Sequence, residues 1–494
     1  MHMLRKSFLI NTQQMNWLKR FLLSFTLVLS GILLLFTSCE KDNFVDEPVN
    51  LKFSQDTVLF DTVFTSIGSS THQFKIYNPK DEDIKISNIH LGKGNNSQFR
   101  INVNGLSGTD FNEVTLHAND SMFVFAEVTV DPNDADQPMV ITDSIVFNTN
   151  GNRQDIKLVA WGQDANFILA DQYIEGLPPF NIVAKEGESI VWDSPKPYVI
   201  YGHAVVDSTA ELTIPAGTDV HFHANSGLWV YKGGSLKVEG TENDPVHFQG
   251  DRLEDYYEDI PGQWDRIWIN EGSVNNKISH AIIENGFIGI QAETLDAPMG
   301  NELELDNVTI RNMTGIGLLG RNYDITGYNM EVSNTGNYSV ALTNGGNYDL
   351  KHLTIANYWS SSIRQTPSVY LNNFYELSDG TILSNDLNAT IGNSIIYGSQ
   401  SNEFLAEDID DGSLLDYTIN HCLVKTEENT SGNKWNNCII NQDPEFEDSG
   451  SADFTLKSTS PAIDNGDPAI NIPFDLKGDS RDAQPDIGAY EYTP

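Results

Sequence analysis

The charged residues best placed to do chemistry in this chain are Arg311, Lys425, Glu284 and Glu331. Cleaving an acidic polysaccharide by elimination requires a cation that neutralises a uronate and a base that removes the adjacent proton. Arg311 or Lys425 could supply the cation. Hydrolysis of a glycosidic bond requires two carboxylates about 5 to 9 Å apart, and Glu284 and Glu331 are a candidate pair. No compact catalytic group emerges, and 69 acidic residues supply such pairs by chance, so binding is favoured over catalysis.

These residues belong to a six-residue phrase that returns seven times between residues 280 and 442. The copies read HAIIEN from 280, NVTIRN from 307, NMEVSN from 329, HLTIAN from 352, NSIIYG from 393, HCLVKT from 421 and NCIINQ from 437. The second and fourth residues are apolar or small, and this alternation predicts strands that turn those side chains inward. Strands returning roughly every 20 to 30 residues, with no helical pattern between them, predict a solenoid, which we interpret as a right-handed parallel β-helix.

The first four phrases close on asparagine, at Asn285, Asn312, Asn334 and Asn357. Stacked coils bring equivalent positions to about 4.8 Å from one another, so these side chains are predicted to form a hydrogen-bonded ladder at a sharp corner. Ordinary turn asparagines are the alternative, and either role is structural. Several aliphatic residues also occupy outward positions, which predicts that a loop or another molecule covers part of this face.

An insertion at residues 251–264 is dense in carboxylates and aromatics. Tyr256, Tyr257 and Trp264, with Trp268 beyond, could form a stacking platform for sugar rings. The alternative, which we favour, is that these rings pack the inserted loop onto the wall of the β-helix.

Two groups of residues contain side chains of the types that bind metals. His221 and His223 lie on one face of a strand, but no third ligand is evident, so no metal is predicted there. The acidic run at residues 403–417 could bind Ca²⁺, but it does not match an EF-hand and a solvated loop is favoured. Cys422 and Cys438 would be neighbours on consecutive coils, and we favour free thiols over a disulfide.

The chain has 494 residues and a formal net charge of −40. This charge favours solubility and repels nucleic acid, which is therefore excluded as a partner. Three cysteines are too few for a disulfide framework. We expect a monomer that requires no cofactor.

The N-terminal segment has the features of an export signal. Lys19 and Arg20 precede an apolar run at residues 21–36 that is short for a membrane anchor, so residues 1–38 are predicted to be a signal peptide. The sequence TSC ending at Cys39 resembles a bacterial lipobox, which implies acylation of Cys39. The following Glu40, Lys41 and Asp42 resemble the surface-export signal of Bacteroidota lipoproteins, which implies exposure on the outer membrane. Residues 39–50 would be a flexible tether.

Residues 51–163 show about seven short alternating runs, which predict an antiparallel β-sandwich. The series FKIYNPKDEDIKISNI, FAEVTVDP and DSIVFNTNGNRQDIKLVAWG resembles the abnormal-spindle type of immunoglobulin-like module, which implies a spacer or interaction role. Residues 164–197 contain LPPF and SPKP and are predicted to be a connector. The β-helix would occupy residues 198–443 and a capping segment residues 444–494.

Two further motifs resemble those of bacterial right-handed β-helix proteins. LTIPAGT and GGSLKVEGT, within residues 210–250, resemble their opening coils. SPAID and DIGAYE, within residues 460–492, resemble their closing motif. A solenoid requires such a cap because its last coil leaves backbone groups and apolar side chains open. Arg481 is predicted to pair with Asp464, Asp475 or Asp486.

Together these features predict a lipid-anchored cell-surface protein whose β-helix binds a glycan or another surface component. A polysaccharide lyase or glycoside hydrolase, and a structural or adhesive envelope protein, are the alternatives.

Overall fold

The computed structural model describes residues 44–132, 139–295 and 302–494. Cys39 and the predicted signal peptide lie outside them. The described residues are almost entirely β-structure, with two short 3₁₀ turns at Gly94–Asn96 and Asp255–Tyr257 and no α-helix. Residues 71–126 and 143–157 lie in one compact unit, and residues 158–494 lie in another. The prediction of an all-β protein is confirmed.

The N-terminal part of the chain forms two five-stranded sheets. The first has the order β1 (Lys52–Phe53), β3 (His72–Tyr77), β8 (Ser121–Val128), β5 (Phe99–Val103) and β6 (Leu106–Gly108). The second has the order β2 (Thr57–Phe64), β10 (Asn152–Gln163), β9 (Met139–Thr149), β4 (Ile84–Leu91) and β7 (Asp110–Leu116). The ring of Phe147 on β9 lies 5.0 Å from that of Phe53 and 6.4 Å from that of Phe74, centroid to centroid. The two sheets therefore pack face to face around an aromatic core.

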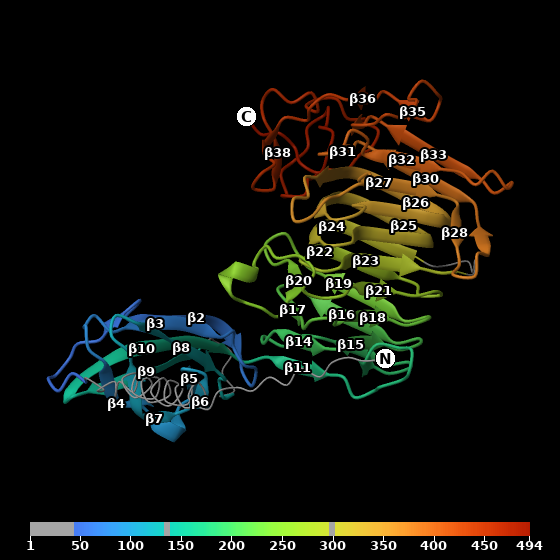
Figure 1. Ribbon diagram of the computed structural model, residues 1–494. Coiled ribbons are helices and arrows are strands. Elements are labelled where there is room, and N and C mark those ends of the chain that lie inside the picture. The colour runs from blue at the N-terminus through green and yellow to red at the C-terminus, as the bar shows by residue number, and fades with distance from the viewer. Residues whose placement is uncertain (1–43, 133–138, 296–301) are drawn as a thin grey trace, which may run out of the picture. The chain divides into compact units, whose positions relative to one another are not determined.

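The rest of the chain winds into a parallel β-helix in which each strand pairs with its equivalent on the next coil (Figure 1). Three sheets result, and we number them 1 to 3. Sheet 1 contains β11 (Asn166–Leu169), β14 (Tyr198–Tyr201), β17 (Asp219–Phe222), β20 (Val246–Gly250), β31 (Ile395–Gly398), β34 (Leu423–Val424) and β36 (Ile439–Ile440). Sheet 2 contains β12 (Phe180–Ala184), β15 (His203–Val206), β18 (Gly227–Val230), β21 (Ile267–Ile269), β23 (Ile288–Glu293), β27 (Val369–Asn372) and β32 (Phe404–Glu407).

Sheet 3 contains β13 (Ser189–Val191), β16 (Glu211–Pro215), β19 (Ser235–Glu239), β30 (Leu387–Gly392), β33 (Leu415–Asn420) and β35 (Trp435–Asn436). Four longer strands run across corners and contribute to more than one sheet: β22 (Asn276–Glu284), β24 (Glu302–Met313), β25 (Ile316–Thr335) and β26 (Val340–Asn357). Two antiparallel hairpins decorate the coil, β28 (Phe374–Glu376) with β29 (Ile382–Ser384), and β37 (Phe446–Asp448) with β38 (Asp453–Leu456).

The corner between sheets 3 and 1 explains why every repeated phrase opens on His or Asn. The opening residue has a positive φ in all seven copies, from 47° at Asn393 to 53° at Asn307 and His352. One residue in the left-handed conformation turns the chain from one sheet into the next, and short polar side chains tolerate that conformation best.

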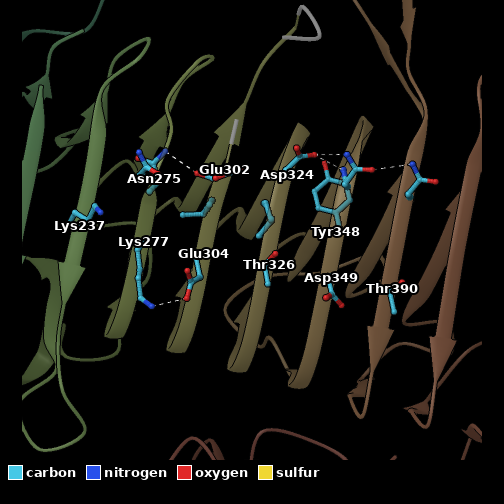
Figure 2. A pocket seen from close by; sticks show the side chains of 15 residues that line it. Lys237, Asn275, Lys277, Glu302, Glu304, Asp324, Thr326, Tyr348, Asp349 and Thr390 are labelled. Atoms are coloured by element: carbon cyan, nitrogen blue, oxygen red, sulfur yellow. Dashed lines mark hydrogen bonds and ion pairs between the residues drawn. The ribbon is translucent and has the colours of Figure 1, made fainter. Parts of the chain in front are cut away.

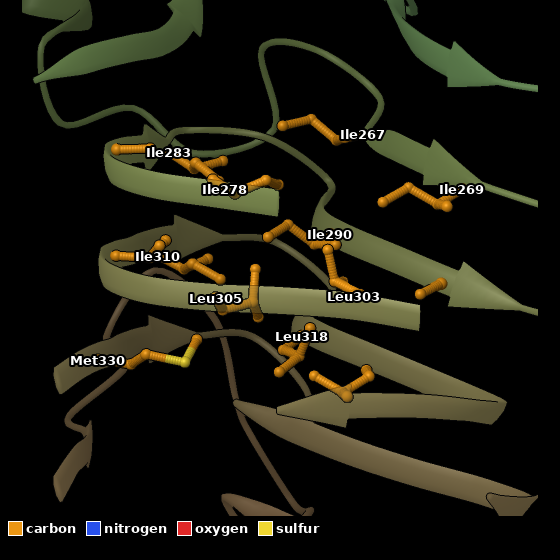
Figure 3. Packing of buried hydrophobic residues seen from close by; sticks show 14 of the residues in the cluster. Ile267, Ile269, Ile278, Ile283, Ile290, Leu303, Leu305, Ile310, Leu318 and Met330 are labelled. Atoms are coloured by element: carbon orange, nitrogen blue, oxygen red, sulfur yellow. The ribbon is translucent and has the colours of Figure 1, made fainter. Parts of the chain in front are cut away.

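The core follows the predicted columns. Ile283, Ile310, Val332 and Ile355 are in register on successive coils and are fully buried. Figure 3 shows Ile283 and Ile310 one above the other, with Leu305 and Leu318 packing from the other sheets. The aliphatic residues at second and fourth positions thus line one continuous interior, as predicted.

The side-chain ladder lies at the opening residues, which corrects the predicted ladder of closing asparagines. Asn329 Nδ2 donates to Asn307 Oδ1 at 3.1 Å, and Asn393 Nδ2 lies 3.0 Å from His352 Nε2. The closing residues bond differently: Asn285 donates to the Glu258 carbonyl and Asn357 to the Thr335 carbonyl. The reason is geometric, because a one-residue corner stacks identically on every coil, whereas the closing residues lead into loops of different lengths.

The C-terminal segment covers the outward face of sheet 1 near the end of the coil. Ile395 and Leu423 are buried in a cluster with Phe454, Ala489 and Tyr490. The Ala489 amide donates to Thr354 Oγ1 at 2.9 Å, which fixes the segment to the wall. A cover over outward aliphatic residues was predicted, and this segment provides it. We call residues 446–492 the cap.

Arg481 holds the cap together through a different partner from those predicted. Its Nη1 pairs with Glu491 Oε2 at 3.1 Å, and its Nη2 donates to Asn329 Oδ1 at 3.1 Å. Asp475 and Asp486 instead accept backbone N–H groups, including the amide of Asp464 at 2.8 Å from Asp486 Oδ1. Backbone donors stabilise a carboxylate as well as an arginine does, so the sequence spacing could not distinguish the two arrangements.

Candidate functional site

Arg311 and Glu284, two of the predicted catalytic candidates, form an ion pair on sheet 1. They are in register on neighbouring strands, and both Nε and Nη2 of Arg311 donate to Glu284 Oε2, at 2.7 and 2.6 Å. The Arg311 side chain is 41% exposed, whereas that of Glu284 is 12% exposed. The cation therefore reaches solvent, while one oxygen of its carboxylate partner is engaged.

Glu331 lies beneath the cap and does not face solvent with Glu284. Its carboxylate accepts hydrogen bonds from the Tyr490 hydroxyl and from Ser333 Oγ, the latter at 2.7 Å. Burial raises the pKa of Glu331, and the two hydroxyl donors offset only part of that effect. The pairing of Glu284 with Glu331 as hydrolytic carboxylates therefore does not fit the structure. The signal that could have shown this was the closing motif itself, because its DIGAYE segment supplies Tyr490.

Lys425 lies away from these residues. It follows β34, and its Nζ donates to the Gly398 carbonyl at 2.8 Å and lies 4.9 Å from the centroid of the Tyr397 ring. Register places Ser333, Ala356 and Tyr397 between Arg311 and Lys425 on the intervening strands. The structure therefore does not bring the two cations together.

The four aromatic residues proposed as a sugar platform point in different directions. Trp264 is buried inside the coil and stacks on Phe222, with ring centroids 4.4 Å apart. Trp268 stacks on Trp229 on the outer face of sheet 2. Tyr256 is 76% exposed on the insertion. No common platform forms from these residues.

The fourth of those rings, Tyr257, packs under the guanidinium of Arg252, at 4.2 Å from its centroid. Trp264 also donates from Nε1 to the Glu284 carbonyl at 2.8 Å. The Trp264 contact agrees with the alternative that this ring packs the insertion onto the wall, whereas the Tyr257 contact lies within the insertion.

A hollow of about 650 Å³ lies on the outer face of sheet 3 and crosses strands from β19 to β30 (Figure 2). Two columns of outward side chains line it, in register from coil to coil. One column contains Glu302, Asp324, Asn347 and Asn388. The other contains Lys237, Lys277, Glu304, Thr326, Asp349 and Thr390. We call this region the sheet 3 groove.

Hydrogen bonds along the coil axis order the side chains of the sheet 3 groove. Asn347 Nδ2 donates to Asp324 Oδ1 at 2.7 Å, and Asn388 Nδ2 donates to Asn347 Oδ1 at 3.2 Å. This short ladder orients amide and carboxylate groups at a fixed repeat. Asn347, Asn388 and Thr390 remain exposed, so they can bond a ligand.

Lys277 is the best-anchored cation of the groove. Its Nζ lies 2.7 Å from Glu304 Oε1 and 3.0 Å from Asp306 Oδ2. Burial lowers the pKa of Lys277, but the hydrogen bonds to these two carboxylates outweigh burial and raise it. Its positive charge is therefore balanced within the protein.

Sequence reasoning did not identify the sheet 3 groove. The signal was present, because alternating runs such as ELELD at 302–306 and LNATIG at 387–392 directly precede the phrase openings. Their polar residues occupy the outward positions. The strand that carries these residues precedes the His or Asn corner and therefore lies outside the repeated phrase.

A second hollow, of about 460 Å³, lies beside Arg311. The wall contributes Arg311, Asn312 and Asn334, and the insertion contributes Asp259. Tyr358, Trp359 and residues 449–452 of the cap complete it. We call it the Arg311 pocket.

The side chains that were candidates for metal ligation, none of which was predicted to bind a metal, are engaged in other contacts. His221 Nδ1 lies 2.9 Å from the Gly250 carbonyl oxygen, and His223 Nδ1 lies 2.7 Å from Asp251 Oδ2. In the acidic run, Glu403 forms a buried ion pair with Arg364. Within the described part of the chain, no three His, Cys, Asp or Glu side chains are grouped so that they could hold a metal ion.

Both cysteines that the structure describes, Cys422 and Cys438, are free thiols, as favoured from the sequence. Burial raises the pKa of Cys422, and Cys438 on the next coil raises it further. Among residues 44–132, 139–295 and 302–494, no helix is long and apolar enough to cross a bilayer.

The comparison with known protein families agrees with the fold. Residues 184–307, about a quarter of the chain, match the family described as "Pectate-lyase like beta helix domain". A search of curated proteins found no match. One similar solved structure is described as a family 123 glycoside hydrolase from Clostridium perfringens involved in glycolipid glycan hydrolysis. It is 8% identical with a TM-score of 0.16, and the match covers 22% of this chain and 23% of that one, so it carries no argument about function.

Proposed function

We propose that the β-helix binds a neutral glycan along the sheet 3 groove without cleaving it, and that a lipid on Cys39 displays the protein at the outer membrane. The observation that supports this proposal is the ladder of in-register amide, hydroxyl and carboxylate groups in a hollow of about 650 Å³. In this proposal the N-terminal sandwich acts as a spacer between the lipid and the β-helix.

The repeat of the groove suits an extended polymer. Parallel strands are about 4.8 Å apart, so equivalent polar groups recur at that spacing along the coil axis. A glycan chain lying across the strands presents a similar set of hydroxyl groups on each successive sugar. Each hydroxyl both donates and accepts, and Asn347, Asn388 and Thr390 offer matching partners.

The charge of the groove favours a neutral glycan over an acidic one. Glu302, Glu304, Asp324 and Asp349 contribute four carboxylates, against the two cations Lys237 and Lys277. Lys277 is already paired with Glu304 and Asp306, and the whole chain carries a net charge of −40. A uronate or sulfate would therefore meet repulsion in the groove.

The arrangement of charges also favours binding over catalysis. A lyase requires a cation free to receive the carboxylate of the substrate, beside a base that can take up a proton. Of the two lysines in the groove, Lys277 is held by two carboxylates, and on sheet 1 Arg311 is held by Glu284. Because these cations are already paired, we propose that the groove binds its ligand without cleaving it.

Affinity electrophoresis of residues 44–494 through neutral and acidic polysaccharides tests the proposal. We expect a neutral polymer such as dextran, galactan or mannan to retard the protein more than polygalacturonate does, with no new reducing ends. Asn347→Ala and Asn388→Ala should each weaken binding about 2- to 12-fold, the value of one hydrogen bond. Asn181→Ala, which removes one hydrogen bond on sheet 2, serves as the matched control. Tighter binding of the acidic polymer, or release of products, would overturn the proposal.

Metabolic labelling with a fatty acid tests the lipid anchor. The full chain should incorporate label and partition into membranes, and Cys39→Ala should do neither. Retention of label in the Cys39→Ala variant would refute acylation at this residue.

A further inference from the structure

The Arg311 pocket carries a second inference, which is independent of the sheet 3 groove because the pocket opens on sheet 1. Its walls come from three separate segments: the β-helix at Arg311, the insertion at Asp259 and the cap at residues 449–452. Its volume of about 460 Å³ falls within the range of about 300 to 1,000 Å³ that is usual for small-molecule sites. It is large enough for one sugar residue but is not extended like the groove.

Arg311 gives the pocket a rigid set of donors. Its two bonds to Glu284 both end on a single carboxylate oxygen, Oε2, so the guanidinium is fixed in position without being enclosed. A fixed, partly exposed guanidinium presents N–H groups in one plane, a geometry that suits two adjacent oxygen atoms of a ligand. Asp259, which is exposed on the insertion, provides an acceptor for hydroxyl hydrogens.

Trp359 gives the pocket an apolar surface. Its indole packs over Gly336, where an added Cβ would lie only 3.1 Å from Cζ2, and its Nε1 donates to Ser362 Oγ at 2.8 Å. The ring is therefore held in place and is partly exposed. A rigid aromatic surface beside hydrogen-bonding groups matches a sugar, which has apolar C–H groups on its faces and hydroxyls around its rim.

We propose that the Arg311 pocket binds one neutral sugar residue, with its hydroxyls bonded to Arg311 and Asp259 and its ring against Trp359. Charge argues against an acidic sugar, because Glu284 and Asp259 together outnumber the one guanidinium. The bound sugar also lies against residues 449–452 of the cap, so it bridges the wall and the cap.

Bridging couples binding to the stability of the cap. The segment that lines the pocket, residues 449–452, connects β37 and β38, and Phe454 of β38 stacks on Tyr358 of the wall, with centroids 6.1 Å apart. A ligand that binds only when the cap is docked stabilises the docked state by mass action. The gain in free energy rises with the logarithm of the ratio of ligand concentration to Kd.

Ligand-detected NMR and hydrogen exchange on residues 44–494 test this inference. The probes are glucose, galactose, mannose and N-acetylglucosamine, with glucuronate and galacturonate as acidic counterparts. We expect at least one neutral sugar to bind and to slow amide exchange in residues 446–456, while neither acid binds more tightly. Asp259→Asn should weaken binding about tenfold or more, because it removes a charged acceptor. Trp359→Ala should also weaken it.

Two controls separate this site from the groove and from misfolding. Asn181→Ala on sheet 2, which lies outside both sites, should leave monosaccharide binding unchanged, and Asp259→Asn should retain the circular dichroism spectrum and melting temperature of the parent. Binding that is lost in Asn347→Ala but kept in Asp259→Asn would place the sugar in the groove and overturn the inference. Absence of binding by every neutral probe, or tighter binding of glucuronate or galacturonate, would overturn it equally.

Discussion

Replacing Ile310 by alanine perturbs the interior on which the whole β-helix depends. Ile310 is fully buried and lies in register with Ile283 and Val332 on the adjacent coils. The substitution removes three carbon atoms, worth about 2.4 kcal/mol at about 0.8 kcal/mol for each buried methylene. The cavity left behind adds to this loss because neighbouring coils cannot close over it, so the expected total is about 2 to 5 kcal/mol.

Urea denaturation followed by circular dichroism measures the loss, with Thr309→Ala as the matched control. Thr309 precedes Ile310 on the same strand, points outward and is only partly buried, so its replacement should change the free energy of unfolding by about 0.5 kcal/mol or less. A solenoid can unfold in segments, which changes the slope of unfolding free energy against urea concentration. Midpoint urea concentrations are therefore compared only between variants that share the same slope.

Double variants show whether the buried aliphatic side chains of neighbouring coils contact one another. Ile283→Ala combined with Ile310→Ala should deviate from additivity by about 0.5 kcal/mol or more, because the two side chains occupy neighbouring coils. Val206→Ala, a buried change on sheet 2 several coils away, should be additive with Ile310→Ala. If Ile310→Ala costs no more than Thr309→Ala, the reasoning that places Ile310 in the interior is refuted.

Three further predictions concern buried polar groups. Tyr490→Phe removes a donor from buried Glu331 and should destabilise the cap by about 1 to 3 kcal/mol, measured by hydrogen exchange in residues 446–492. Burial raises the pKa of Asp486 from 3.8 to about 6, although the amides of Tyr492 and Asp464 lower it. Its stabilising contribution is therefore complete below pH 3.8 and is lost as the pH rises through about 6, and Asp486→Asn should flatten this dependence of the melting temperature. Glu403→Gln leaves the guanidinium of Arg364 buried without its counter-charge and should cost about 3 to 5 kcal/mol in thermal unfolding.

Each of these has a clear contrary result. Unchanged exchange in the cap of Tyr490→Phe would mean that Glu331 is satisfied by other groups. A cap that becomes more stable between pH 4 and pH 7 would contradict the pKa shift of Asp486. A neutral effect of Glu403→Gln would show that the Arg364 ion pair is dispensable.

The interior of the β-helix was predictable because it follows from local alternation. The second and fourth residues of each phrase point inward whatever lies between the phrases, so Ile283 and Ile310 could be assigned without knowing the loops. For Trp264 the sequence left two alternatives, a sugar-stacking ring and the favoured ring that packs the insertion onto the wall, because the insertion interrupts the alternation. Its stacking on Phe222 inside the coil depends on how that loop returns to the wall.

The candidate sites were much less predictable. The sheet 3 groove depends on register between strands up to 41 residues apart, such as the hydrogen bond from Asn388 to Asn347. The Arg311 pocket requires the insertion, the wall and the cap to meet, although Asp259 and Ser451 are far apart in sequence. The same cap enclosed Glu331, which removed it as a partner for Glu284.

The sequence alone determined the repeating unit: alternating strands, an inward aliphatic pair and a His or Asn corner. These properties depend on side-chain direction and backbone conformation within a few residues, so each phrase carries them in full. Only the tertiary structure decided which polar groups become neighbours, which of them the cap buries and where hollows remain. Those outcomes depend on loops of unequal length and on contacts between distant segments, and no local pattern encodes them.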